Sequence, residues 1–417
     1  MINQYIEKIS FILILIIPIS IVVGPSISLL NVIIINFLIF FIFFGKKKKL
    51  SFLTHYSLKS LLLLYFYLIF NNFISLDNEI NLARNYGFVR LILFFIFINY
   101  FFFHFNSRKI LNYWTILFFI FVFDVYYEYF VGSNIFGWGA LEIDGVEQPH
   151  ALRIISFFKD EPIAGAFMSG FIFLLFGNLL NEYPQKKILG VIFLLTVFLA
   201  ILLTGERSNT IKVLLGIILF FLLSNNFSLK SKLITPIVIF LFSIIIISQS
   251  NYIKTRYIDQ TLEKINSRSN ITNFLSNNLY IKLYNSGFEV FKSYPFFGVG
   301  NKNYRVETCD DKKNKIRNSK YICMTHPHQV YIEFLSEHGI FGTMFVILIF
   351  FYLMFKIYKE NFLSENPIQL GAFVFILINF TPLIPSGSFF SDFNLFIFFI
   401  NLSIMFGSHK KTNIFNK

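Results

Sequence analysis

Two histidines and two glutamates lie close together in one short stretch, THPHQVYIEFLSEHGIFG, which covers residues 325–342. A neutral imidazole at His328 could accept a proton from a hydroxyl nucleophile, the usual work of a general base with an ordinary pKa of about 6.5. The plainer interpretation is that His326 and His328 cap a helix. The spacing alone leaves both interpretations open.

A metal site is the less favoured chemistry for this stretch. Residues at i and i+2 of a helix do not face each other, so His326 and His328 would converge only in an irregular turn. A zinc site also needs a third protein ligand, and the sequence offers no obvious one. We therefore expect no metal here.

The stretch also has the marks of a helix start. Thr325 is a good N-cap and Pro327 suits a first turn, so we expect a helix that begins at these residues. The segment from His326 to Lys356 is too long for one straight membrane span of about 20 residues. We therefore expect a break or tilt near residues 339–342.

Charged residues precede two other apolar runs. The segment RIISFFKDEPIAG (153–165) contains Arg153, Asp160 and Glu161, and TGERSN (204–209) contains Glu206 and Arg207. An arginine binds the paired oxygens of a phosphate with its planar fork. Arginines at helix ends are also common interfacial anchors. Several arginines on one face of one protein favour the binding role.

The composition determines what must position these residues. The chain is 55% hydrophobic and 14% charged, with 60 phenylalanines among 417 residues. A membrane span needs about 20 mostly apolar residues. We predict an all-α polytopic membrane protein, one transmembrane domain over 1–417, whose first helix is retained because it lacks a cleavage pattern. The twelve predicted helices lie near 9–24, 27–45, 51–72, 88–104, 111–130, 162–180, 188–204, 210–224, 232–250, 339–357, 367–384 and 392–407.

Basic residues in the short loops predict the orientation. Under this segmentation they fall on one side, which the positive-inside rule assigns to the cytoplasm. An even number of helices then places both termini in the cytoplasm. The long insertion 251–325, between helices nine and ten, lies on the opposite face. The cytoplasmic basic residues are Lys46 to Lys49, Arg108, Lys109, Lys186, Lys187, Lys230, Lys232, Lys356, Lys359, Lys410 and Lys411.

Both cysteines, Cys309 and Cys323, belong to this long insertion. If the outer compartment is oxidising, they are natural partners for a disulfide. The net charge of +13 is partly topological. Nucleic acid is a poor partner for the remainder, because no binding module is recognisable. An anionic lipid-linked substrate is a better one.

The ordered set of these segments resembles the bacterial O-antigen polymerases and O-antigen ligases, integral membrane proteins that transfer glycans from undecaprenyl diphosphate on the periplasmic face. The resemblance runs from about residue 150 to 395. Its most specific element is the histidine stretch, in which the family usually has His-Asn where this chain has His328-Gln329. The other elements are Arg153 with F-x-D-E (158–161), the TGERS turn, PFFGVGNKNYR (295–305) and PLIPSGSFF (382–390).

The resemblance implies a glycosyltransferase with a membrane architecture of the GT-C type, no nucleotide sugar, no cofactor and no required metal. It implies that His328 is catalytic and that Arg153 and Arg207, with Arg84, hold the donor diphosphate. The partners implied are the lipid bilayer, an undecaprenyl-diphosphate-linked oligosaccharide donor and a glycan or lipid A-core acceptor. The resemblance is also compatible with a partner protein that regulates the length of the glycan chain. The supporting residues implied are Asp160, Glu161, Glu206, His326, Gln329 and Glu337.

Three functions remain open at this point. A polymerase joins one lipid-linked repeat unit to another, and the F-x-D-E and S-G-S-F-F elements favour it. A ligase moves the finished glycan to lipid A core or to a protein. A transporter of the lipid-linked glycan is less favoured, because the polar residues gather on one side and not near the membrane midplane. For the two enzymes we expect the bacterial inner membrane with a periplasmic active site.

Overall fold

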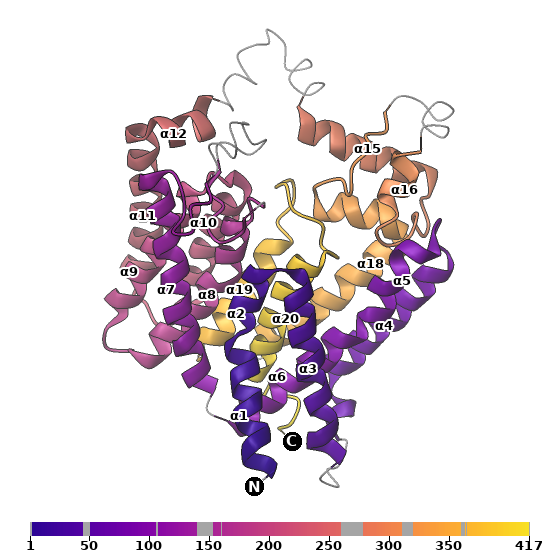
Figure 1. Ribbon diagram of the computed structural model, residues 1–417, viewed down its shortest axis with the longest axis horizontal. Coiled ribbons are helices and arrows are strands. Elements are labelled where there is room, and N and C mark those ends of the chain that lie inside the picture. The colour runs from indigo at the N-terminus through magenta and orange to yellow at the C-terminus, as the bar shows by residue number, and fades with distance from the viewer. Residues whose placement is uncertain are drawn as a thin grey trace.

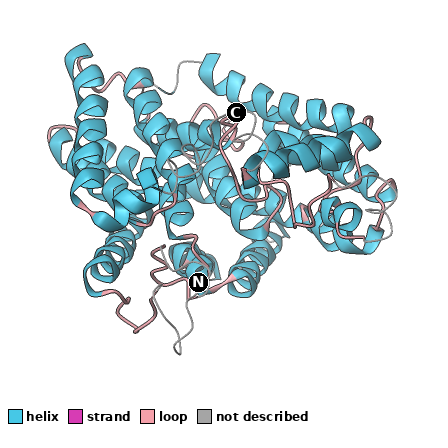
Figure 2. Ribbon diagram, turned by 90° about the horizontal axis from the view of Figure 1, so that it is seen from above, coloured by secondary structure: helices cyan, strands magenta, loops and turns pink. Residues whose placement is uncertain are grey.

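The computed structural model describes residues 2–44, 51–105, 107–139, 153–159, 161–259, 278–310, 320–359, 363 and 365–416. Within these ranges the chain forms helices and loops and no strand (Figure 2). Both termini lie at one end of the molecule, and α12, α15 and α16 lie at the other (Figure 1). The second end is called the outer end below.

Seventeen α-helices are defined in this part of the chain, together with a 3-10 turn at Ser51–Thr54 and a π turn at Thr255–Asp259. The helices are α1 (Ile2–Leu15), α2 (Ile17–Val23), α3 (Pro25–Phe44), α4 (Tyr56–Phe73), α5 (Asn78–Gly87), α6 (Val89–His104), α7 (Ser107–Val131), α8 (Ala164–Glu182), α9 (Lys187–Leu203), α10 (Arg207–Leu223), α11 (Leu229–Gln249), α12 (Asn251–Lys254), α15 (Leu279–Ser293), α16 (Tyr304–Thr308), α18 (Val330–Lys359), α19 (Pro367–Asn379) and α20 (Asp392–Gly407).

Each of the twelve segments predicted from hydropathy contains helix. The first is divided between α1 and α2, and the tenth is the second part of α18. The short helices α5, α12, α15 and α16 were not predicted, because they are too polar or too short to be recognised by hydropathy. The basic cluster 46–49 lies outside the described residues.

Length and composition identify the helices that can cross a bilayer. Five helical segments of the described chain are long and apolar enough, and the bent pair α1 and α2 makes a sixth. Four more apolar helices are shorter, including α9, α19 and α20. The architecture is that of a polytopic membrane protein. The five spans are Asn78–His104, Lys109–Val131, Ala164–Glu182, Leu229–Gln249 and Val330–Lys359.

The bend between α1 and α2 has a local cause. Pro18 lies in the first turn of α2 and has no N–H to donate to the carbonyl of Ile14. The indole N–H of Trp114, from α7, donates to the carbonyls of Ile14 and Leu15 at 3.1 Å each. These bonds satisfy the carbonyl groups freed at the bend and attach the N-terminal helices to α7.

Helices α8, α19 and α20 form the centre of the bundle. Nearly every residue of α8 is buried, and α19 packs against α8, α10 and α20. Phenylalanine rings fill much of this space in edge-to-face pairs, such as Phe350 with Phe398 and Phe94 with Phe396. By contrast, the span α11 is mostly exposed. The centre is therefore closely packed, and the loops at its outer end carry the polar residues described next.

Candidate functional site

Helix α18 is broken at Gly339, where φ is 63° and ψ is −169°. The break that the sequence predicts near residues 339–342 is confirmed. A break inside a buried helix frees backbone N–H and C=O groups, which need new partners. The loop 295–300 crosses the break and supplies them. Its four hydrogen bonds are Val299 N to Ser336 O (3.0 Å), Gly300 N to Glu337 O (2.9 Å), Ile340 N to Pro295 O (2.8 Å) and Phe341 N to Phe296 O (3.2 Å).

This junction requires glycine on both sides. A Cβ atom at Gly339 would lie 2.3 Å from the carbonyl carbon of Phe296, and Gly339 also has a positive φ that disfavours other residues. A Cβ atom at Gly298 would lie 2.4 Å from the carbonyl carbon of Glu337. The motif FFGVG therefore has a structural task, which is to hold the two parts of α18 at a fixed angle.

The histidine stretch does not begin the helix where the sequence analysis places it. Helix α18 begins at Val330, and the side-chain oxygen of Gln329 accepts a hydrogen bond from Ile332 N at 2.9 Å. The predicted N-cap at Thr325 is therefore wrong. The reason is His328, whose φ of 57° is incompatible with a right-handed helix. Gln329 takes the capping role.

The irregular backbone brings the two histidine rings together, with centroids 4.0 Å apart. The turn 382–390 holds them there. Ser386 N donates to His328 O at 2.9 Å, and Ser386 O lies 3.4 Å from His326 Nε2. The sequence allows the two rings to converge only in an irregular turn, and this segment is such a turn.

Both imidazoles are neutral at ordinary pH. Burial, followed by the positive charge of Lys302, lowers the pKa of His326 to about 4. Burial, followed by the neighbouring His326, lowers the pKa of His328 to about 4. A neutral His328 can accept a hydrogen bond from a hydroxyl group. In the described chain no group of three or more His, Cys, Asp or Glu residues is placed to hold a metal ion.

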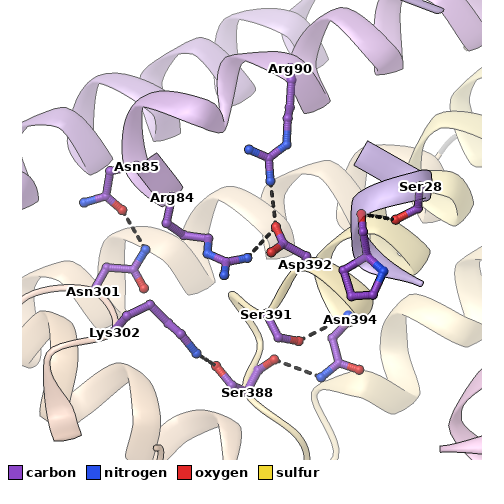
Figure 3. A network of polar contacts seen from close by, with 11 residues as sticks. Ser28, Arg84, Asn85, Arg90, Asn301, Lys302, Ser388, Ser391, Asp392 and Asn394 are labelled. Atoms are coloured by element: carbon purple, nitrogen blue, oxygen red, sulfur yellow. Dashed lines mark hydrogen bonds and ion pairs between the residues drawn. The ribbon is translucent and has the colours of Figure 1, made fainter. Parts of the chain in front are cut away.

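A chain of hydrogen bonds joins three segments beside the histidines. Lys302 Nζ donates to Ser388 Oγ at 2.6 Å, and Ser388 Oγ donates to the buried carboxylate of Glu333 at 2.5 Å. The second oxygen of Glu333 accepts from Phe389 N at 3.0 Å. The predicted supporting residue Glu337 is also buried and accepts from the backbone N–H of Lys302 at 2.8 Å. Figure 3 shows the Lys302 and Ser388 part of this chain.

Three arginines gather on the other side of the outer end. Burial lowers the pKa of Arg256, and the nearby positive charges of Arg153 and Arg207 lower it further. Arg256 Nε donates to the carbonyl of Gly205, inside the TGERS turn, at 3.2 Å. Sequence motifs point to Arg153 and Arg207 but not to Arg256, which lies in the long insertion without a motif around it.

Glu206 ties this group to the bundle. Its side chain accepts from Gly165 N, at the start of α8, and from Asn209 Nδ2, each at 2.6 Å. Burial raises the pKa of Glu206 to about 7, although these hydrogen bonds and the charge of Arg153 oppose the rise. Glu206 therefore fixes the turn that carries Arg207. Glu161 is exposed, and Asp160 lies outside the described residues.

Tyr280 connects the arginines to the histidines. Its ring lies 6.2 Å from that of His328 in an edge-to-face arrangement, and Tyr280 also belongs to the surroundings that affect the pKa of Arg256. Asn278 caps α15 by accepting from Tyr280 N at 3.0 Å, which places Tyr280 in the first turn. The sequence gives no signal for Tyr280, because only the fold brings α15 between the two groups.

The remaining predicted arginine, Arg84, lies in a third group. Arg84 and Arg90 both contact Asp392 Oδ1, at 2.5 Å and 2.7 Å (Figure 3). These residues belong to α5, α6 and α20, whereas the other three arginines belong to the segments around α8, α10 and α12.

The outer segment itself is tied together close to the site. Cys309 and Cys323 form a disulfide bond, with Cα atoms 4.5 Å apart. Ser286, on α15, contacts the hydroxyl group of Tyr304 at 2.6 Å and accepts from Ile322 N at 2.9 Å. These contacts hold α15 and α16 to the segment that leads to the histidines.

A comparison with known families identifies the middle of the chain. Residues 189–347 match the family described as O-Antigen ligase. The resemblance to the O-antigen polymerase and ligase family is therefore confirmed. The matched region contains Arg207, Arg256, Tyr280 and His328, while Arg153 and the turn 382–390 lie outside it. No curated protein matches this chain.

Proposed function

We propose that this protein is a repeat-unit polymerase that transfers a glycan from undecaprenyl diphosphate to the hydroxyl group of an acceptor sugar. The observation that carries the proposal is the position of Tyr280, whose ring contacts that of His328 and which also belongs to the surroundings that affect the pKa of Arg256. A cationic group suited to a diphosphate and a neutral imidazole suited to a hydroxyl group therefore share one neighbour at one end of the bundle.

In the proposed step the acceptor oxygen attacks the anomeric carbon while the bond from that carbon to the diphosphate oxygen breaks. The diphosphate leaves with the electron pair, and the acceptor proton moves toward the neutral nitrogen of His328. Arg153, Arg207 and Arg256 stabilise the charge that grows on the diphosphate. They supply the positive charge that a metal ion would otherwise supply, so we propose a metal-independent reaction.

The other residues of the site position these groups. Glu206 holds the turn that carries Arg207, and the chain from Lys302 through Ser388 to Glu333 holds the turn that supports His328. Gln329 caps α18 and so determines where His328 leaves the helix. We assign Glu337 to the junction with the loop 295–300.

We further propose that all twelve helical segments cross the bacterial inner membrane in a GT-C-like arrangement. Both termini would be cytoplasmic and the site periplasmic. The placement of the two termini at one end and of α12, α15 and α16 at the other supports this topology (Figure 1). Labelling of single cysteines from outside intact cells tests it, and a reactive probe at position 47 would contradict it.

The alternative is an O-antigen ligase, which the description of the matched family favours. A ligase would use the same donor site and the same His328, and it would differ only in the acceptor. The products separate the two functions: a polymerase lengthens the glycan on its lipid carrier, while a ligase moves it to lipid A core or to a protein. The third candidate, a transporter, would leave the glycan on its original carrier.

The proposal is tested by glycan transfer from a purified lipid-linked donor to a lipid-linked acceptor. His328→Ala should lower the rate by about 10²- to 10⁴-fold, because a positioned base is lost. Donor binding should persist, since arginines on other segments meet the donor. His104→Ala, on the last turn of α6, is the matched control and should transfer normally. A folded His328→Ala protein with a near-normal rate would remove the general-base role.

A further inference from the structure

Arg84 and Arg90 form ion pairs with the same carboxylate, that of Asp392. Both guanidinium groups contact the same oxygen of Asp392, so the group keeps one net positive charge. A guanidinium has five N–H donors, and these contacts leave others available on each group. About a quarter of each arginine side chain and 41% of the Asp392 side chain are exposed. An anion from outside can therefore reach both arginines.

A small pocket, partly open to solvent, adjoins this group between α3, α6 and α20. Arg90, Asp392 and Ser28 form its polar part, and the remaining lining is largely apolar, as at Leu29, Val32 and Phe396. Asp392 and Arg90 stand in the first turns of α20 and α6, so the polar part lies at the outer end of the bundle. A phosphate group attached to an apolar chain matches this combination of charge and lining.

The pocket is joined to His328 by one short turn. Ser386 at its start donates to His328 O, and Asp392 follows its end at the beginning of α20. Within the turn, Ser388 O accepts from Asn394 Nδ2 at 2.8 Å, and Ser388 Oγ accepts from Lys302 (Figure 3). The turn is therefore fixed at both ends. The turn consists of the six residues 386–391, and six extended residues span at most about 20 Å. A short oligosaccharide can bridge that length between the pocket and His328.

We propose that Arg84, Arg90 and the adjoining pocket bind the polyprenyl diphosphate of the acceptor, a second lipid-linked repeat unit. The inference rests on the proposed polymerase function, because only a polymerase needs two polyprenyl diphosphates at once. The donor diphosphate occupies Arg153, Arg207 and Arg256 on other elements. The acceptor sugars extend from Arg84 and Arg90 along the turn 386–391, so that their far end reaches His328.

The test counts undecaprenyl diphosphate molecules bound to the purified full chain, by native mass spectrometry at rising lipid concentration. The wild-type chain should bind two. Arg207→Gln should weaken one binding event and Arg90→Gln the other, each by roughly tenfold or more, since a charged hydrogen-bonding partner is lost. In transfer assays Arg90→Gln should raise KM for the acceptor and leave KM for the donor unchanged.

Asp392→Asn should change the affinity for the second diphosphate in the opposite direction to Arg90→Gln. The comparison therefore distinguishes a lost binding site from a misfolded protein. Removing the competing carboxylate should tighten the second binding event by about tenfold, because both guanidinium groups become available to the phosphate. A purely structural ion pair predicts instead that Arg90→Gln and Asp392→Asn damage the protein alike.

Two results would overturn the inference while leaving the proposed function in place. One is a single bound diphosphate that Arg207→Gln removes and Arg90→Gln does not affect. The other is displacement of the second diphosphate by phosphatidylglycerol at equal concentration, which would make the pocket a general anionic lipid site. Loss of both binding events in Arg90→Gln, with Arg207→Gln unaffected, would instead refute the donor site of the proposed function.

Discussion

Replacing Lys302 with methionine tests how the loop 295–303 and the turn 382–390 support His328. The change keeps the length of the side chain and removes its charge and its hydrogen bond. Lys302 Nζ lies 2.6 Å from Ser388 Oγ, which in turn donates to Glu333. The variant therefore removes the positive charge that favours the ionised form of two buried carboxyl groups, Glu333 and Glu337.

The size of the effect follows from this contact. A hydrogen bond to a charged group contributes about 1.5–3 kcal/mol. If the turn loses that much restraint in the transition state, the transfer rate falls by about 10- to 150-fold, since 1.4 kcal/mol corresponds to a factor of ten. Donor affinity should stay within about twofold, because the arginines that meet the diphosphate belong to other segments.

The pH profile supplies a second measurement. The charge of Lys302 helps to keep the pKa of His326 near 4. Without that charge the pKa of His326 rises toward its ordinary value of about 6.5, so the imidazole becomes protonated at a higher pH. The acid side of the transfer profile should therefore move to higher pH in Lys302→Met.

The assay is glycan transfer in detergent or nanodiscs, with rates at saturating donor measured between pH 4 and pH 8 and donor binding measured in parallel. Lys292→Met is the matched control, because that lysine is exposed and forms a surface ion pair with Glu289. A folded Lys302→Met protein with a normal rate and an unchanged acid limb would refute the reasoning. The chain from Lys302 to Glu333 would then stabilise the fold without supporting His328.

Three further outcomes follow from the same contacts. Gly339→Ala should destabilise the protein by about 5–6 kcal/mol, from about 1–2 kcal/mol of positive-φ strain and about 1 kcal/mol for each of four bonds across the break. A thermal midpoint within about 2 °C of the wild type would contradict this. Because burial lowers the folded pKa of His326 and His328 to about 4, their contribution to stability is complete above about pH 6.5 and falls as pH drops toward 4. The unfolding midpoint should therefore be lower at pH 4.5 than at pH 7, and this difference should be smaller in His326→Gln. Peptide mapping without reduction should recover Cys309 and Cys323 as one linked pair, and finding both free in membrane-isolated protein would refute the pairing.

Local sequence determined the helical architecture of this protein. Hydrophobic runs of 15 to 20 residues leave the backbone no partner in a membrane except itself, so the twelve helical segments can be predicted without knowledge of their neighbours. The break in α18 follows from length, since the segment from residue 326 to 356 exceeds one span. The pairing of Cys309 with Cys323 follows from their shared insertion, and the family follows from short motifs in a fixed order.

Only the tertiary structure decided which polar residues form the site. Lys302 and Ser388 are 86 residues apart, and Arg84 and Asp392 are 308 apart, so no local pattern links either pair. Hydropathy carries no information about these pairs, because it locates the apolar segments and does not show which polar residues between them meet. The meeting of His326 and His328 depends on a left-handed backbone at His328, which the turn 382–390 stabilises from a distant part of the chain. The apolar pattern of a helix depends only on residues close in sequence. The site depends on contacts between the ends of several helices that are far apart in sequence.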